Sequence, residues 1–181
     1  MKLENTIQAV QNLGANVVKE GKRILKKKPS HETNQNTLYR GFNYLVTRLK
    51  DVIELRFEFR GAEDYWDFVD EGVKGSGGFK GSGKMRGQGS PFSFKGKNIA
   101  RGVVKNWIKY KPLKLRNAQG RFIEKTEANI KSAAFVIGRA IAQRGLTRTR
   151  FFRKPFTEEL NKQADSILDG FGKDIEIEIG I

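Results

Sequence analysis

The stretch from Gly72 to Phe92, GVKGSGGFKGSGKMRGQGSPF, carries the residues with the spacing closest to that of a known chemical site. Read from Gly78, the letters GFKGSGK match the G-x-x-x-x-G-K pattern with which a P-loop holds nucleotide phosphates. Met85 stands where a P-loop needs Ser or Thr to coordinate magnesium, and the following RGQGSPF is a poor start for a helix. We therefore expect no nucleotide site here, and no cofactor for the protein.

A second chemical candidate is the acidic segment AEDYWDFVDEG, whose carboxylates have the chemistry of an acid–base pair or of metal ligands. On a helix, Glu63, Asp67, Asp70 and Glu71 would share one side, which favours an exposed acidic face. No other acidic cluster and no neighbouring His or Cys completes a site. We expect no metal, and an enzyme that uses Asp67 and Asp70 is the weakest alternative.

Nucleophilic catalysis also lacks its usual parts. The chain has no Cys, Ser90 has no neighbouring base, and the single histidine, His31, lies in the polar stretch KPSHETNQN. Cysteine-based zinc sites and disulfides are excluded for the same reason. The sequence predicts a protein that is not an enzyme.

The net charge of +15 is unevenly distributed along the chain. Residues 72–123 carry thirteen Lys or Arg and no acid, and residues 128–157 add seven more basic residues, again without an acid. This segregation suits contact with a polyanion, or docking of one copy's acidic surface on the next copy's basic one. For any single run of basic residues, a face that serves solubility alone is an equal alternative. The candidates for contact with DNA or a partner are Lys74, Lys80, Lys84, Arg86, Lys95 and Lys97, interleaved with Phe79, Phe92 and Phe94 as stacking faces.

Hydrophobic periodicity places these residues on a mixture of helices and strands. Helices are expected over residues 3–28, 98–109, 127–144 and 158–171. Gly14 and Gly21 lie on the apolar side of the first helix and would admit a partner helix. Alternating residues predict an antiparallel pair of strands in YLVTRL and VIELRFEF, and a further strand in the C-terminal DIEIEIGI.

Together these elements predict one α+β domain over residues 1–181. A small antiparallel β-sheet packs with helices, residues 1–28 form a long N-terminal helix, and residues 72–97 form a flexible, protruding, glycine-rich basic loop. No apolar run approaches the roughly 20 residues that span a bilayer, and the N-terminus lacks the pattern of a signal peptide. We expect a soluble protein made in a cytoplasm, without membrane contact.

Several motifs, taken in order over residues 35–181, resemble the neck and tail-completion proteins of tailed bacteriophages, which include head-to-tail connectors and minor tail proteins. DYWDFVDEG matches an aromatic-x-x-Phe-Val-Asp/Glu-x-Gly segment that precedes a variable glycine-rich loop. SPFSF, the tryptophan-bearing VVKNWIKYK, and IGRAIAQRGLTRTRFFRKPFTEEL follow in the order typical of that family. The resemblance implies a noncatalytic virion protein of the neck or upper tail, active in head–tail joining, tail completion and DNA ejection.

The resemblance also implies a ring of identical copies around the DNA channel, in contact with neighbouring neck, portal-adaptor or tail proteins and, nonspecifically, with passing DNA. The acidic AEDYWDFVDEG of one copy and the basic RTRFFRK of the next are expected to meet across the subunit interface. The candidates for this interface are Tyr65, Trp66, Asp67, Asp70, Glu71, Arg148, Arg150, Phe151, Phe152 and Arg153. Core packing of the aromatic members is an equal alternative.

The same residues also fit a different class of function. The glycine- and lysine-rich loop also suits a sequence-tolerant nucleic-acid-binding protein that uses the loop as an arm. No helix-turn-helix, RNP motif or zinc finger accompanies it. Salt-dependent binding by an isolated monomer would distinguish this function from that of a ring through which DNA passes.

Overall fold

A computed structural model describes residues 3–27, 37–50, 52–80, 83–96, 98–99, 101–110 and 113–179. The side chains of residues 103, 110 and 177–179 are not among those described. The chain divides into two compact units where the sequence predicts one domain: unit 1 comprises Met1–Asp70 and Thr149–Ile181, and unit 2 comprises Glu71–Arg148. Helices combine with short antiparallel ladders, so the predicted α+β class is confirmed.

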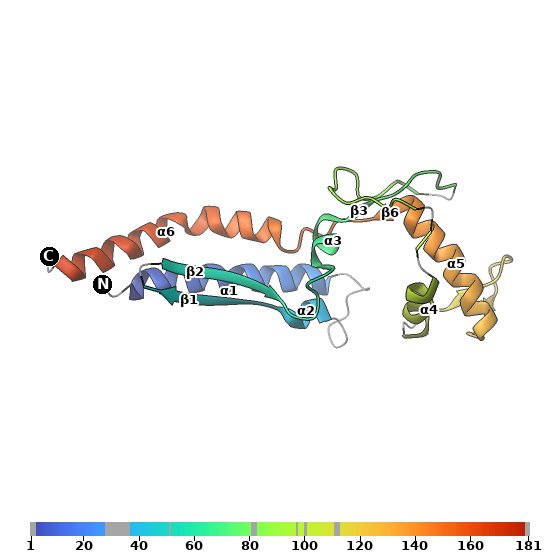
Figure 1. Ribbon diagram of the computed structural model, residues 1–181, viewed down its shortest axis with the longest axis horizontal. Coiled ribbons are helices and arrows are strands. Elements are labelled where there is room, and N and C mark those ends of the chain that lie inside the picture. The colour runs from blue at the N-terminus through green and yellow to red at the C-terminus, as the bar shows by residue number, and fades with distance from the viewer. Residues whose placement is uncertain are drawn as a thin grey trace. The chain divides into compact units, whose positions relative to one another are not determined.

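Unit 1 is built from two long helices and a hairpin (Figure 1). Helix α1 (Glu4–Lys26) packs against α6 (Arg153–Ile179) and against the hairpin of β1 (Phe42–Leu49) and β2 (Val52–Phe59). Helices α1 and α6 run in opposite directions, so the beginning of α1 and the end of α6 lie at the same end of the unit (Figure 1). The short helices α2 (Thr37–Gly41) and α3 (Trp66–Glu71) flank the hairpin in sequence.

The hairpin confirms the predicted antiparallel pair with one apolar face. Phe42 lies opposite Phe59 and Tyr44 opposite Phe57, and these residues alternate along the strands with exposed Asn43 and Leu45. The core face joins Val17 and Leu25 of α1 in one apolar cluster. The period of two in the sequence therefore reports the burial of a single face.

Two glycines of α1 make room for aromatic rings. A Cβ on Gly14 would lie 2.4 Å from the Tyr44 ring, and one on Gly21 would lie 2.4 Å from the Phe42 ring and 2.6 Å from the Phe151 carbonyl oxygen. Helix α1 can therefore approach the hairpin more closely than a helix with side chains at these positions. The space that the sequence assigns to a partner helix is filled by β1.

The predicted C-terminal strand is wrong, because α6 continues to Ile179. Asp174 and Gly170, in the last turns of α6, pack against the beginning of α1 at Asn5 and Thr6. A helix stabilised by such packing overrides the alternation of Ile with acidic residues, because β-propensity depends strongly on context. Residues 180 and 181 lie outside the described part of the chain.

Unit 2 has its own small core. Helices α4 (Arg101–Tyr110) and α5 (Glu127–Arg144) pack together with the hairpin of β4 (Leu115–Arg116) and β5 (Phe122–Ile123). The buried residues of this cluster are Val104, Ile108, Leu115, Ile130 and Ala134. Thr126 caps α5 by accepting a hydrogen bond from the Asn129 amide, and β3 (Val73–Lys74) pairs with β6 (Gly145–Leu146) just after α5. The predicted helix over 127–144 is confirmed with the same bounds.

Candidate nucleic-acid interface

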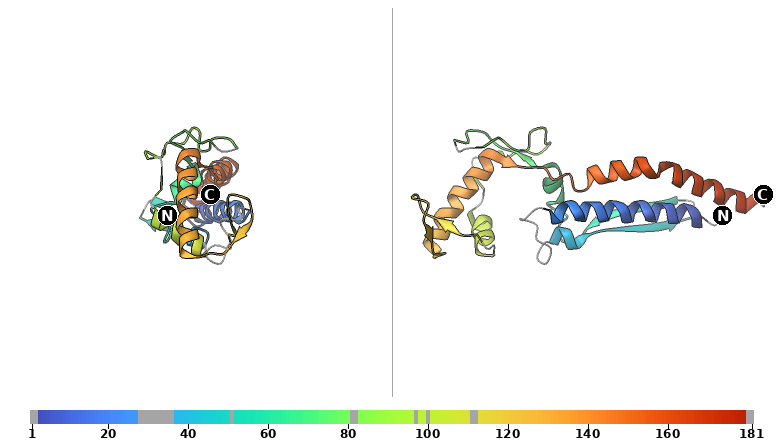
Figure 2. Two further views of the ribbon diagram at one scale, coloured as in Figure 1. Left: turned by 90° about the vertical axis from the view of Figure 1, so that its right-hand side faces the viewer. Right: turned by 180° about the vertical axis from the view of Figure 1, so that it is seen from behind.

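The glycine-rich segment of unit 2 lies on the C-terminal end of α5 (Figure 2). The amides of Ser76, Gly77 and Arg86 donate to the carbonyls of Ala142, Gln143 and Arg144, at 2.9, 3.1 and 2.8 Å respectively. These carbonyls belong to the last turn of the helix, where no intrahelical donor is available. The segment therefore completes the hydrogen bonding of α5.

Close backbone approach explains why this segment is rich in glycine. A Cβ on Gly75 would lie 2.2 Å from the Gln143 carbonyl oxygen, and one on Gly87 would lie 2.2 Å from the Val73 carbonyl oxygen. Gly87 also has a φ of 66°, in the left-handed region that other residues rarely adopt. A larger side chain at Gly75 would push the segment away from the end of α5, and one at Gly87 would push it away from β3.

A P-loop geometry is not found in the described part of this segment. A P-loop directs its amides at phosphate from the beginning of a helix, whereas the amides here satisfy carbonyls at the end of one. No helix follows Lys84 and Met85 in residues 83–96. The negative end of the α5 dipole instead favours nearby cations, and the Arg144 side chain donates to the Lys84 carbonyl at 3.0 Å.

The structure exposes the loop cations that the sequence singles out. Lys74, Lys80, Lys84, Arg86 and Lys95 are exposed, and Lys97 lies outside the described residues. The loop is predicted to be flexible, yet the backbone of Lys74 is held on both sides. It forms hydrogen bonds with Phe92 and Phe94 on one side and pairs with Gly145 on the other. The segment can therefore present several cations from a defined backbone.

The three loop phenylalanines are less open than the sequence suggests. Phe79, Phe92 and Phe94 are half-buried, and the guanidinium of Arg144 lies 5.4 Å from the centroid of the Phe79 ring. Because all three rings are half-buried, less of each is open to a base, which weakens the prediction that they stack with bases.

The division into units shows where the charge of the protein lies. Unit 2 holds 18 Lys or Arg and 3 Asp or Glu, and unit 1 holds 17 of each. The whole excess of +15 therefore belongs to residues 71–148. One of the acids of unit 2, Glu127, lies 2.5 Å from Lys105 and 3.4 Å from Lys109.

A further cationic feature, the β4–β5 hairpin, is missing from the sequence predictions. Leu115 and Ile123 form one cross-strand pair, and Arg116 and Phe122 form the next. The Asn117 side chain accepts hydrogen bonds from the amides of Gln119 and Arg121, and Gly120 has a φ of 78°. The turn sequence Asn-Ala-Gln-Gly between LR and RFI is the signal that would have revealed it.

In unit 1, the acidic and basic segments that are predicted to meet between two copies contact each other within one chain. Asp70 is fully buried, and its carboxylate accepts a hydrogen bond from the Phe152 amide at 2.8 Å, at the start of α6. The Arg153 side chain lies 3.6 Å from Asp70 and 3.2 Å from Asp67. The predicted exposed acidic face is therefore wrong for Asp70, because this carboxylate caps a helix.

The aromatic interface candidates lie mainly in the core of unit 1. Phe151 is fully buried, and Phe152 is half-buried with its ring 5.5 Å from that of Trp66. Trp66 in turn stacks on Phe59 at a centroid distance of 4.2 Å. Tyr65 is 38% exposed, so among these four it is the one most available to a neighbouring copy.

The remaining interface candidates have different surroundings. Arg150 is exposed, with a φ of 53°, and its amide donates to the Asp70 carbonyl at 3.0 Å. Arg148 is half-buried in unit 2 and donates to the carbonyl of Gln88 in the glycine-rich segment. Glu71 ends α3 and is half-buried. Unit 1 contains Arg150, whereas Arg148 and Glu71 belong to unit 2.

A second buried carboxylate, Asp174, serves the beginning of α1. Its side chain is 2% exposed and accepts hydrogen bonds from the amides of Asn5 and Thr6, at 3.1 and 2.9 Å, and from the Thr6 hydroxyl at 2.6 Å. Burial alone would raise the pKa of Asp174, but the hydrogen bonds from Thr6 and Asn5 outweigh it and lower the pKa to about 2. Asp174 is therefore ionised at neutral pH.

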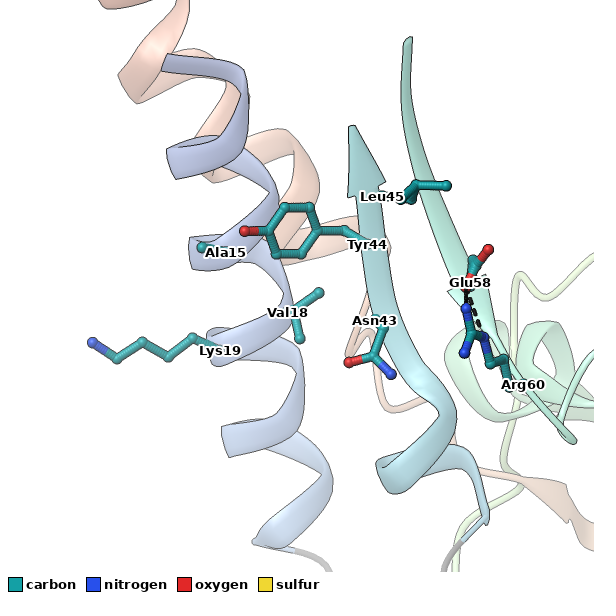
Figure 3. A pocket seen from close by; sticks show the side chains of 8 residues that line it. All are labelled: Ala15, Val18, Lys19, Asn43, Tyr44, Leu45, Glu58 and Arg60. Carbon is teal, nitrogen blue, oxygen red and sulfur yellow. Dashed lines mark hydrogen bonds and ion pairs between the residues drawn. The ribbon is translucent and has the colours of Figure 1, made fainter. Parts of the chain in front are cut away.

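No group of three or more His, Cys, Asp or Glu in the described residues could hold a metal ion. An open depression of about 410 Å³ lies between α1 and the hairpin, lined by Lys19 and Tyr44 among others (Figure 3). Its one ion pair joins neighbouring Glu58 and Arg60 at 2.7 Å. None of the described helices combines the length and apolar character needed to cross a membrane.

No family model matches the chain, and neither a curated protein nor a solved structure matches it. The resemblance to phage neck proteins therefore stays a prediction from the sequence. Function has to be argued from the residues and their placement.

Proposed function

We propose that the protein is a noncatalytic structural component of a tailed-phage virion. In this proposal it forms part of the neck or upper tail, as a homo-oligomeric ring around the DNA channel. The observation that supports it best is the concentration of the whole excess charge of +15 in unit 2, beside a unit with as many acids as bases. A cationic unit suits contact with DNA, and a neutral unit with a large aromatic core suits a scaffold.

The contacts inside unit 1 change the expected ring interface. Asp67, Asp70 and Arg153 interact within the chain, so the proposed contact between copies does not use them as its salt bridges. Tyr65 and Arg150 remain exposed. The revised interface places these residues at its centre, with Tyr65 as the aromatic anchor.

The proposal is tested by the assembly state of the full chain and by its place in particles. We expect mass photometry to find a particle mass that is an integer multiple of the 20.5 kDa chain, as for a closed ring, either for the chain alone or after addition of tail and capsid partners. Purified particles of a phage that encodes the chain should contain it, and an antibody label should mark the neck or upper tail in electron micrographs. A chain that stays monomeric with all partners and is absent from particles contradicts the proposal.

A second candidate, a sequence-tolerant nucleic-acid-binding protein, is supported by the five exposed loop cations of unit 2. Such a protein would bind DNA or RNA as a monomer, with affinity that falls steeply as salt rises. A ring that DNA must traverse would hold it weakly. Titration of one duplex at several salt concentrations, with the assembly state measured in parallel, separates the two functions.

A further inference from the structure

The β4–β5 hairpin of unit 2 exposes an aromatic ring among cations. Phe122 is 59% exposed, more than Trp107 at 40% or Phe135 at 38%, the other large exposed aromatic residues in the described part of unit 2. Burial of a Phe side chain is worth about 1.5–3 kcal/mol. A ring left in water at this extent is therefore available to a partner.

The register of the hairpin explains why Phe122 points outward. Leu115 is 5% exposed and pairs with half-buried Ile123, and both belong to the core of unit 2. Residues next to them in each strand face the opposite way, so Arg116 and Phe122 share the outer face. The core of unit 2 thus fixes the direction of the Phe122 ring.

Cations surround this ring. The Arg116 guanidinium lies 4.2 Å from the ring centroid and the Lys114 ammonium 5.4 Å from it. Arg116 is held in place by a hydrogen bond of 3.1 Å to the Gly120 carbonyl, across the turn. Exposed Arg121 precedes the ring in sequence, and Glu124 is the nearest acid along the chain.

We propose that the β4–β5 hairpin is a binding site for single-stranded nucleic acid, in which an unpaired base stacks on Phe122 while Lys114, Arg116 and Arg121 contact phosphates. Aromatic side chains in a cationic surface are the means by which proteins bind single strands without sequence preference. A duplex covers its base faces by stacking and offers none to Phe122. The site therefore prefers single strands to duplexes of the same length.

This inference rests on the cationic character of unit 2, which also supports the proposed function. It does not require a ring, because one hairpin contains the whole site. Failure to bind single strands leaves ring assembly untouched, and failure to form a ring leaves the hairpin site untouched.

The test measures binding of the purified full chain to fluorescein-labelled 20-nucleotide dT, 20-nucleotide rA and a 20-base-pair duplex by anisotropy. Phe122→Ala should weaken binding of the single strands by about 5- to 150-fold, the equivalent of one stacked base. It should change duplex binding by less than about 2-fold and leave the salt slope unchanged, because no charge is removed. The dT and rA arms show whether the site favours DNA or RNA.

Matched variants separate stacking from charge and from misfolding. Phe122→Trp should retain single-strand affinity, and Phe122→Leu should lose it. Phe171→Ala, which removes a 45% exposed ring from unit 1, should bind as the wild type does. Lys114→Gln and Arg121→Gln should each reduce the single-strand salt slope by about 0.7.

Three results would overturn the proposal. The first is a wild-type chain that binds no single strand even at about 50 mM salt, where electrostatic binding to nucleic acid is strong. The second is a Phe122→Ala variant with wild-type circular dichroism and wild-type single-strand affinity. The third is a Phe122→Ala variant that loses duplex and single-strand affinity equally.

Discussion

At the scale of single residues, two buried carboxylates of unit 1 each serve the beginning of a long helix. Asp70 accepts from the Phe152 amide at the start of α6, and Asp174 accepts from the Asn5 and Thr6 amides at the start of α1. Helix α1 has Leu3 at its N-cap, without a side-chain hydrogen bond of its own. A carboxylate from elsewhere in the chain supplies the missing acceptor and complements the helix dipole.

Asp174 makes the stability of the protein depend on pH. Its pKa is about 2 in the folded chain, against an ordinary value of 3.8. The stabilising contribution is therefore complete above pH 3.8 and is lost as pH falls through about 2. Asp174→Asn should lower the melting temperature at pH 7 by several degrees, because an Asn amide offers fewer acceptors to these donors.

Thermal melts followed by circular dichroism between pH 2 and pH 7 check this prediction. The difference between wild type and Asp174→Asn should shrink as the pH approaches about 2. Asp165→Asn, at an exposed position of the same helix, should melt as the wild type does. Equal melting temperatures of Asp174→Asn and wild type at pH 7 would show that the cap contributes nothing.

At the scale of elements, close packing between α1 and the hairpin depends on small residues. Gly21 meets the Phe42 ring and the Phe151 carbonyl at distances that leave no room for a Cβ. The aromatic rings of Phe42, Phe59 and Phe151 interact with one another at this point, with centroid distances of 5.1 Å for Phe42–Phe59 and 5.5 Å for Phe42–Phe151. Movement of α1 would disturb the whole aromatic core of unit 1.

Gly21→Ala should therefore destabilise the protein by about 1–3 kcal/mol, although Ala is the better helix former. Gly172→Ala is the matched control, since a Cβ at this position of α6 meets no atom within 4 Å. It should stabilise the protein by up to about 1 kcal/mol. Urea unfolding curves of the two variants and the wild type measure both effects. A Gly21→Ala variant as stable as Gly172→Ala would contradict the packing described here.

At the scale of the whole molecule, the separation of charge between units matters more than its total. The loop cations of unit 2 lie on a segment held to the end of α5, so several of them keep defined positions relative to one another. Unit 1 contains as many acids as bases, and many of its cations lie within reach of carboxylates, as Arg23 does with Glu20 at 2.7 Å. Polyanion contact should depend on which unit a cation belongs to.

Two variants of equal net charge test this dependence. The first replaces with Gln the exposed loop cations Lys74, Lys80, Lys84, Arg86 and Lys95, and the second replaces with Gln the exposed unit 1 cations Lys19, Lys26, Lys27, Arg40 and Lys173. The loop variant should bind duplex DNA more weakly, and its salt slope should fall by up to about 0.9 for each phosphate that the loop no longer neutralises. The unit 1 variant should stay close to the wild type. Equal weakening in both would mean that net charge alone governs binding.

Elements whose pattern is strong over many residues could be predicted from the sequence alone. The helix over 127–144 and the strands of the first hairpin follow from regular periodicity, and the α+β class follows from their combination. The excess of cations in residues 72–123 is likewise a property of the sequence alone. These features need no knowledge of distant contacts, since local spacing decides which face of an element is apolar.

The surroundings of Asp70, Asp174 and Phe122 could not be predicted in this way, because they depend on contacts between distant parts of the chain or on strand register. A buried capping carboxylate and an exposed acid have the same letter in the sequence. The difference depends on amide donors that lie 82 residues away from Asp70 and 168 residues away from Asp174. The C-terminal alternation predicted a strand because contact with α1 is invisible to a local pattern. Phe122 is a candidate for stacking with a base because the register of the β4–β5 ladder places its ring on the face opposite the core.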